Sequence, residues 1–109
     1  MCDYDRSVAV AVEDNPAGQR FEISKDGELA GFTAYRRTEG QIAFVHTEID
    51  KRFEGQGLGS ELIHAALDDA RHEELAVLPF CPFVLGYIQR HPEYAELVRE
   101  GDRERFGLS

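Results

Sequence analysis

The stretch of sequence that decides the fold runs from Phe44 to Ile63 and reads FVHTEIDKRFEGQGLGSELI. Its first part alternates with a period of two, which predicts a strand with Phe44, His46 and Glu48 on one face and Val45, Thr47 and Ile49 on the other. Its last part begins a helix whose apolar residues recur every three or four positions, namely Leu58, Leu62, Ile63, Ala66, Leu67 and Ala70.

Three glycines, Gly55, Gly57 and Gly59, alternate with other residues between the strand and the helix. Glycine at every other position lets backbone N–H groups point inward, with no Cβ to keep a ligand away. The loop leads into a helix N-terminus, whose unpaired donors and positive dipole end favour an anion. This arrangement predicts a site for a diphosphate; the alternative is a flexible connection that binds nothing.

The best-known phosphate motifs do not fit this loop, because no Gly-Lys-Ser/Thr is present and Ser60 stands where the dinucleotide fingerprint has its last glycine. The spacing resembles instead the coenzyme A diphosphate loop of the GCN5-related N-acetyltransferases (GNAT). In that superfamily the loop usually begins with Arg or Gln, whereas this chain has Glu54. A carboxylate repels a diphosphate unless it turns outward or pairs with Lys51 or Arg52.

Composition limits the possible classes of function. With 109 residues, 42% of them apolar, the chain suits one domain that spans residues 1–109. The net charge of −9 argues against nucleic-acid binding and is compatible with a cationic acceptor. Cys2 and Cys81 are too few for a disulfide framework, and no membrane span or signal peptide is visible. We therefore expect a cytoplasmic protein without a membrane partner.

The N-terminal half predicts an antiparallel β-meander. Residues 8–12 suit a short strand or an ordered arm, and a turn at residues 15–18 follows. A strand containing Phe21 and Ile23 then precedes a hairpin turn at Asp26-Gly27. The next strand is expected to place Leu29, Gly31, Thr33 and Tyr35 on one face and Ala30, Phe32 and Ala34 on the other. After a turn at Gly40, the third strand runs from Gln41 to Asp50.

The C-terminal half predicts a helix from Leu58 to Glu74 and a buried strand at residues 75–78, parallel to the Gln41–Asp50 strand. Pro82 suits the first position of a second helix, which His91-Pro92 ends, and residues 95–98 form a last short helix. The predicted fold class is α+β, with an antiparallel meander, a crossover helix, a parallel strand and C-terminal helices. This order resembles the core of a GNAT domain without the usual pair of helices between the first two strands.

Cys81 is expected to cap the second helix, whose positive end favours the thiolate form. The alternative is a small buried residue without chemical significance. In the GNAT fold the two parallel strands splay apart and the acyl thioester lies in the gap, which is where the predicted topology puts Cys81.

The resemblance is closest to the small, single-domain GNAT-like acetyltransferases and covers residues 20–98. It rests on His46-Thr47-Glu48-Ile49, on residues 54–60, and on the later runs Cys81-Pro82-Phe83-Val84, Tyr87-Ile88 and residues 90–94. It implies that acetyl-CoA is bound by Thr47, Ile49, Glu54, Gly55, Gln56, Gly57, Leu58, Gly59 and Ser60. The strand backbone would pair with the pantetheine arm, and the loop donors would hold the diphosphate.

Two routes for acetyl transfer to a small-molecule or peptide amine follow from the resemblance. In direct transfer, His46, Glu48 or a water takes the proton of the amine and Tyr87 protonates the departing thiolate. In covalent transfer, Cys81 takes the acetyl group first. Each residue has a structural alternative, since His46 also suits a hydrogen-bonded core position and Tyr87 suits helix packing.

Other classes of function stay open at this point. The domain either turns acetyl-CoA over or only binds an acyl-CoA as a sensor, and Cys81 is the feature that separates the two hypotheses. A plain nucleotide-binding protein is a third hypothesis, which predicts that ATP or NAD stabilises the fold better than CoA. His64, His72 and the carboxylates lack the spacing of metal ligands, so we predict no metal. The oligomeric state is a monomer or a homodimer.

Overall fold

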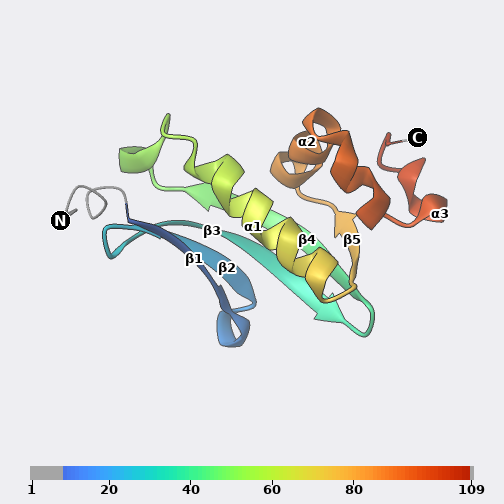
Figure 1. Cartoon of the computed structure of the whole chain (residues 1–109), viewed down its shortest axis with the longest axis horizontal. Coiled ribbons are helices and arrows are strands. Elements are labelled where there is room, and N and C mark those ends of the chain that lie inside the picture. Colours follow the sequence, from blue (N-terminus) through green and yellow to red (C-terminus); the bar gives the residue numbers. More distant parts are fainter. Residues whose placement is uncertain (1–8, 109) are drawn as a thin grey trace.

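Along the chain, a four-stranded meander comes first and a cluster of helices comes last. The computed structural model describes residues 9–108 (Figure 1). Its elements are β1 (Val10–Asn15), η2 (Pro16–Gly18), β2 (Arg20–Lys25), β3 (Glu28–Thr38), β4 (Gln41–Ile49), η3 (Lys51–Phe53), α1 (Leu58–His72), β5 (Ala76–Pro79), α2 (Pro82–Arg90), η4 (Pro92–Leu97) and α3 (Glu100–Arg103).

The strands form one five-stranded sheet in the order β1-β2-β3-β4-β5. The first four are antiparallel neighbours, and β5 pairs in parallel with β4 from Gln41↔Ala76 to Phe44↔Pro79. Gly27 and Gly40 make the two tight turns, with φ of +84° and +81°, a region that favours glycine. The predicted α+β class, meander and parallel neighbour are confirmed.

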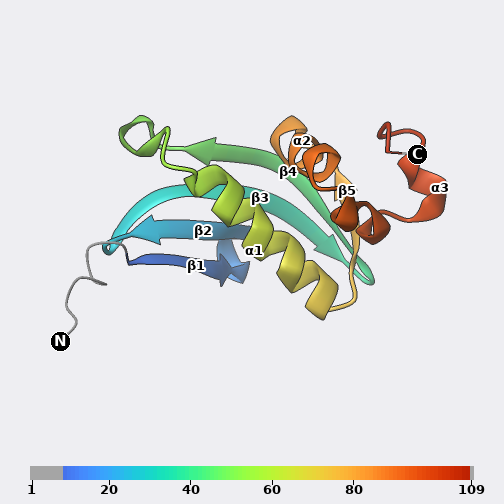
Figure 2. The same ribbon diagram turned by 45° about the horizontal axis from the view of Figure 1, so that its top comes forward.

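Helix α1 lies across one face of the sheet (Figure 2). Its predicted apolar stripe is buried in full and packs against Phe21, Ile23, Tyr35, Ile42 and Phe44 of the strands. The helix ends two residues before the predicted Glu74. Glu74 has a left-handed φ of +58°, and the N–H of Leu75 bonds back to the Ala70 carbonyl, which turns the chain toward β5.

The predicted faces of β4 are right for His46 and Glu48 but wrong at Phe44, because the strand contains a β-bulge. Tyr35 pairs with Phe44 and Ala34 pairs with His46, so Val45 has no partner on β3. One extra residue reverses the side-chain alternation from that point on. Phe44 is buried on the α1 face, whereas His46, predicted to share that face, is exposed.

A second bulge changes the predicted faces of β3. Ile23 pairs with Gly31 and Ser24 pairs with Leu29, so Ala30 is the extra residue. Ala30 is 1% exposed and Leu29 is 44% exposed, although the alternation places Leu29 with the buried Thr33. The predicted set of Leu29, Gly31, Thr33 and Tyr35 on one face is therefore wrong at Leu29.

The ends of the chain differ in detail from the prediction. The first strand begins at Val10 and continues to Asn15; the predicted start at Val8 lies outside the described residues, as does Cys2. The predicted last helix is a 3₁₀ helix, η4, and the following α3 is not evident from the sequence pattern. Within residues 9–108, no helix combines the length and the hydropathy needed to cross a lipid bilayer.

Candidate functional site

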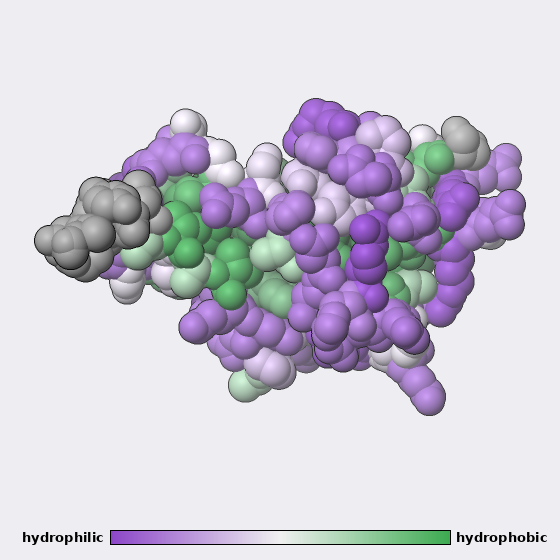
Figure 3. Space-filling model, in the orientation of Figure 1, coloured by the Kyte–Doolittle hydropathy of each residue, from purple (hydrophilic) through white to green (hydrophobic). Residues whose placement is uncertain are grey.

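A cavity of about 450 Å³ opens where the end of β4, the glycine loop and the first turns of α1 and α2 meet. On the face drawn in Figure 3, hydrophobic surface is exposed beside the start of α1, whereas the later turns of α1 are mostly hydrophilic. The cavity is lined by Thr47, Ile49, Phe53, Glu54, Gly55, Gly57, Leu58, Gly59, Ser60 and Phe83. Eight of the nine residues predicted to bind the cofactor are in this set; Gln56 is not.

Glycine is required at the three loop positions for two different structural reasons. Gly55 and Gly57 have φ of +83° and +77°, and a Cβ at either position would meet no other atom within 4 Å. Both are therefore required by the backbone conformation, and both leave the space beside the loop open. Gly59 is required by packing, since a Cβ there would lie 2.5 Å from Cζ of Phe83.

The N-terminus of α1 supplies unpaired donors to the cavity. The first helical bond runs from the Glu61 N–H to the Gly57 carbonyl at 3.1 Å, so the N–H groups of residues 58–60 precede the first acceptor inside the helix. The N-cap is Gly57, which has no side chain to cap them. Leu58, Gly59 and Ser60 all line the cavity, and this donor set fits a phosphate group.

Of the two arrangements that would keep the Glu54 carboxylate from repelling a diphosphate, residues 9–108 do not show the ion pair. Arg52 binds Asp50 and Glu28 instead, and Glu54 lines the cavity. No ion pair joins Glu54 to Lys51 or Arg52 in the described chain. Neither Lys nor Arg lines the cavity, so Glu54 is its one formally charged side chain among residues 9–108.

Cys81 lies beneath the wall of the cavity, at the point where β4 and β5 separate. The parallel ladder ends at Phe44 and Pro79, and the Cys81 N–H donates to the Phe44 carbonyl at 2.9 Å. Cys81 caps α2 with Pro82 as the first helical residue, as predicted. Its thiol donates to Oγ1 of Thr47 at 3.3 Å and is bonded to no helix N–H.

The Cys81 contact continues into the sheet. Thr47 lines the cavity, and its hydroxyl lies 2.8 Å from that of the fully buried Thr33. Cys81 itself is 3% exposed. The structure therefore joins Cys81 to a cavity-lining residue through one hydrogen bond, with the sulfur shielded from solvent.

His46 and Glu48 lie on the opposite side of β4 from the cavity. Their side chains are 57% and 62% exposed, and Nε2 of His46 lies 2.7 Å from Oε2 of Glu48. The alternative of a buried core histidine is therefore wrong. The ring of Phe32 lies beside them, with its centroid 6.0 Å from that of His46.

Tyr87 does not line the cavity. It is 4% exposed, stacks on the ring of His91 at 4.0 Å, and places its hydroxyl 3.4 Å from Nδ1 of His64. Burial raises the pKa of Tyr87, and the negative charges of Asp68 and Glu93 raise it further. The hydroxyl therefore keeps its proton at neutral pH, which the proposed acid requires, but it points into a polar cluster between α1 and α2.

Three residues at the site were not predicted from the sequence. Phe53 of η3 and Phe83 of α2 both line the cavity. Lys25 contacts the side chain of Gln56. A signal for Phe83 was present in the Cys-Pro-Phe-Val motif. Phe83 lies in the first turn of the helix that Cys81 was predicted to cap, and that turn reaches the cavity. No local pattern indicates Lys25, because its contact spans 31 positions.

Known proteins resemble this chain in sequence model and in fold. A family model described as GCN5-related N-acetyl-transferase matches residues 20–97. The NMR structure of a GCN5-like protein from Staphylococcus aureus superimposes with a TM-score of 0.62 at 21% identity, covering 85% of this chain and 89% of that one. The likeness at this identity concerns the fold.

A second solved structure and the curated sequences add little. Ard1 from Thermoplasma volcanium aligns with a TM-score of 0.47 at 22% identity over 52% of this chain and 39% of that chain. The chain thus spans less than half the length of Ard1. Among curated protein sequences, none matches this chain.

Proposed function

This chain belongs to the GCN5-related N-acetyltransferase family, and on that premise we propose that it transfers an acetyl group from acetyl-CoA to an amine. One observation carries the proposal: the uncapped N-terminus of α1 and the positive-φ glycines open into the cavity that Thr47 lines. The donors suit a phosphate, and Thr47 connects the cavity to Cys81. We also propose that the whole chain forms one such domain.

The chain's own groups divide the work of binding. The N–H groups of Leu58, Gly59 and Ser60 bind the diphosphate, and the left-handed Gly55 and Gly57 orient the loop for them. The backbone of β4 at Thr47 and Ile49 binds the pantetheine arm beyond the point where β5 separates. Acetyl-CoA supplies the acetyl group as a thioester, which Cys81 and the acceptor amine then compete to attack.

The covalent route uses Cys81 as the nucleophile. Sγ attacks the thioester carbonyl carbon, the bond between that carbon and the CoA sulfur breaks, and the thiol proton passes to the CoA sulfur. In the second step the amine nitrogen attacks the acetyl carbon and its bond to Sγ breaks. The His46–Glu48 pair accepts the amine proton and passes it to solvent, and solvent returns one proton to Sγ. In the direct route the amine attacks the thioester itself and gives its proton to the His46–Glu48 pair, and the Tyr87 hydroxyl turns away from His64 to protonate the CoA sulfur.

Mass spectrometry after incubation with acetyl-CoA tests the covalent route. We expect one acetyl group per chain, lost in Cys81→Ser and kept in Cys2→Ser, which removes the only other cysteine of the chain. A panel of polyamines, amino acids and basic peptides, monitored by release of free CoA thiol, then identifies the acceptor class. Turnover without an adduct would favour direct transfer.

A second candidate function is an acyl-CoA-binding module without turnover. The observation that favours it is the state of Cys81, which is 3% exposed and donates its S–H to Thr47. A sensor needs the glycine loop and has no use for an accessible sulfur. Saturable CoA binding would support this alternative if no adduct forms and no amine in the panel causes release of free CoA thiol from acetyl-CoA.

A further inference from the structure

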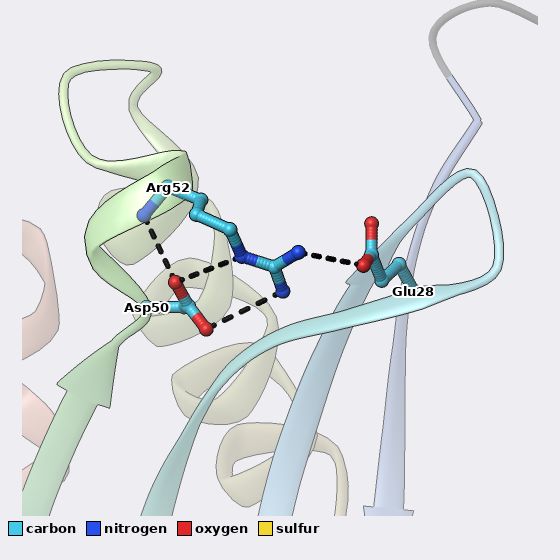
Figure 4. A network of polar contacts seen from close by, with 3 residues as sticks. All are labelled: Glu28, Asp50 and Arg52. Carbon is cyan, nitrogen blue, oxygen red and sulfur yellow. Dashed lines mark hydrogen bonds and ion pairs between the residues drawn. The ribbon is translucent and has the colours of Figure 1, made fainter.

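The β2–β3 hairpin turn is tied to the loop that follows β4 by two side-chain bridges. One joins Nη1 of Arg52 to Oε2 of Glu28 at 2.8 Å (Figure 4). The other joins the ammonium of Lys25 to the side-chain oxygen of Gln56, the residue between the two left-handed loop glycines. The hairpin is therefore a neighbour of the proposed phosphate loop, although it is more than twenty positions away in the sequence.

The charge of Arg52 is already matched by two carboxylates. Its guanidinium lies 3.2 Å and 3.4 Å from the oxygens of Asp50, in addition to its contact with Glu28 (Figure 4). Hydrogen bonds to Asp50 and then to Glu28 raise the pKa of Arg52. Arg52 thus holds the hairpin in place and has two anionic partners before any ligand binds.

The charge of Lys25 is not matched in this way. Its partner Gln56 is a neutral amide, and within residues 9–108 no carboxylate forms an ion pair with Lys25. Glu28, which lies opposite Lys25 in the hairpin, is the carboxylate bound to Arg52. Among residues 9–108, the hairpin therefore places against the glycine loop an ammonium whose partner is a neutral amide.

The cavity beside that loop lacks a cation of its own. Its lining contains Glu54 and neither Lys nor Arg, so backbone donors alone face the phosphates and one carboxylate opposes them. An ammonium is a flexible point charge with three donors, which can exchange an amide oxygen for a phosphate oxygen without moving the backbone.

We propose that Lys25 binds a phosphate of acetyl-CoA, with Gln56 holding its ammonium beside the loop until the cofactor arrives. The inference rests on the proposed function, since it assigns a further residue to the same site. It makes the hairpin part of the binding site and gives the chain the cation that is missing from the glycine loop. The ligand atom is an oxygen of the diphosphate or of the 3′-phosphate.

Calorimetric titration of the full chain with CoA and with 3′-dephospho-CoA tests the proposal. We expect Lys25→Gln to weaken CoA binding by about three- to tenfold, and this loss to shrink at high salt because an exposed ion pair is screened. A loss with both ligands assigns the diphosphate, and a loss with CoA alone assigns the 3′-phosphate. The matched control is Lys51→Gln, which removes the same charge from η3, and we expect a change of less than about twofold.

Four outcomes would overturn the proposal. Equal losses in Lys25→Gln and Lys51→Gln would mean a general field effect. A loss in Lys25→Gln that is independent of salt would mean that Lys25 only braces the loop through Gln56. Unchanged affinity in Lys25→Gln removes Lys25 from the site and leaves the proposed function standing. If the native chain binds neither ligand, the proposed function fails and the inference fails with it. Thermal unfolding of each variant confirms that it is folded.

Discussion

Replacing Gly57 by alanine tests the central argument about the loop. Gly57 is the N-cap of α1 with φ of +77° and ψ of 10°, a left-handed conformation that costs an L-residue about 1–2 kcal/mol. A Cβ there meets no atom within 4 Å, so the whole penalty is backbone strain. The loop is exposed and flanked by Gly55, and we expect it to relax to negative φ, which turns the first N–H groups of α1 away from the cavity.

The strain then reappears when the cofactor binds. Restoring the left-handed conformation takes back about 1–2 kcal/mol, so we expect CoA affinity to fall roughly five- to thirtyfold. The free energy of unfolding should fall by less than about 1 kcal/mol, because the unbound loop has relaxed. The change therefore separates an effect on binding from an effect on the fold.

Gly40→Ala is the matched control. Gly40 has a similar φ of +81°, but it makes the tight β3–β4 turn, whose paired strands leave no room to relax. We expect its free energy of unfolding to fall by about 1–2 kcal/mol, with CoA affinity unchanged. Urea unfolding and calorimetric titration measure both quantities. If Gly57→Ala bound CoA as tightly as the native chain while Gly40→Ala behaved as expected, the loop would not be the phosphate site.

Three further changes probe the surrounding groups. Thr47→Val should lower the free energy of unfolding by about 1–2 kcal/mol in urea, because it leaves the buried hydroxyl of Thr33 without its partner. If Tyr87 is the acid, Tyr87→Phe should lower the rate at which free CoA thiol forms from acetyl-CoA without changing CoA affinity. Equal rates in the variant and the native chain would make Tyr87 a packing residue. Burial and the hydrogen bond to Asp14 raise the pKa of Tyr35 from 10.0 to about 12. The folded state therefore holds the phenolic proton of Tyr35 more tightly than the unfolded state does. The resulting contribution to the free energy of unfolding is present below pH 10 and is lost as the pH rises toward 12. Tyr35→Phe should reduce this loss in unfolding curves measured at alkaline pH.

The fold was predictable where a local pattern carries the information. The apolar stripe of α1, the Asp26-Gly27 turn and Pro82 at the start of α2 all depend on nearest neighbours, and the structure has each of them. The parallel pairing of β5 followed from the handedness of a strand–helix–strand crossover. The glycine loop was likewise recognisable, since residues 54–60 contain both its backbone requirement and its donors.

The faces of β3 and β4 were not predictable in the same way. A bulge is defined by which residue lacks a partner on the neighbouring strand, and the residue types of Ala30 and Val45 do not mark them as the unpaired ones. Lys25 and Gln56 meet for a similar reason, because the contact exists only once the hairpin and the loop are side by side. Register and long-range contact are properties of the sheet as a whole, so a single strand read by itself cannot supply them.

The bulge at Val45 has a consequence for the proposed transfer. Without it, Phe44, His46 and Glu48 would share the α1 face, and a polar pair would displace the apolar packing beneath the helix. With it, Phe44 completes the core, Thr47 faces the cavity, and His46 and Glu48 face solvent on the other side of the same strand. The groups proposed for the cofactor and those proposed for the amine proton therefore stand on opposite sides of β4, where β5 no longer covers its edge.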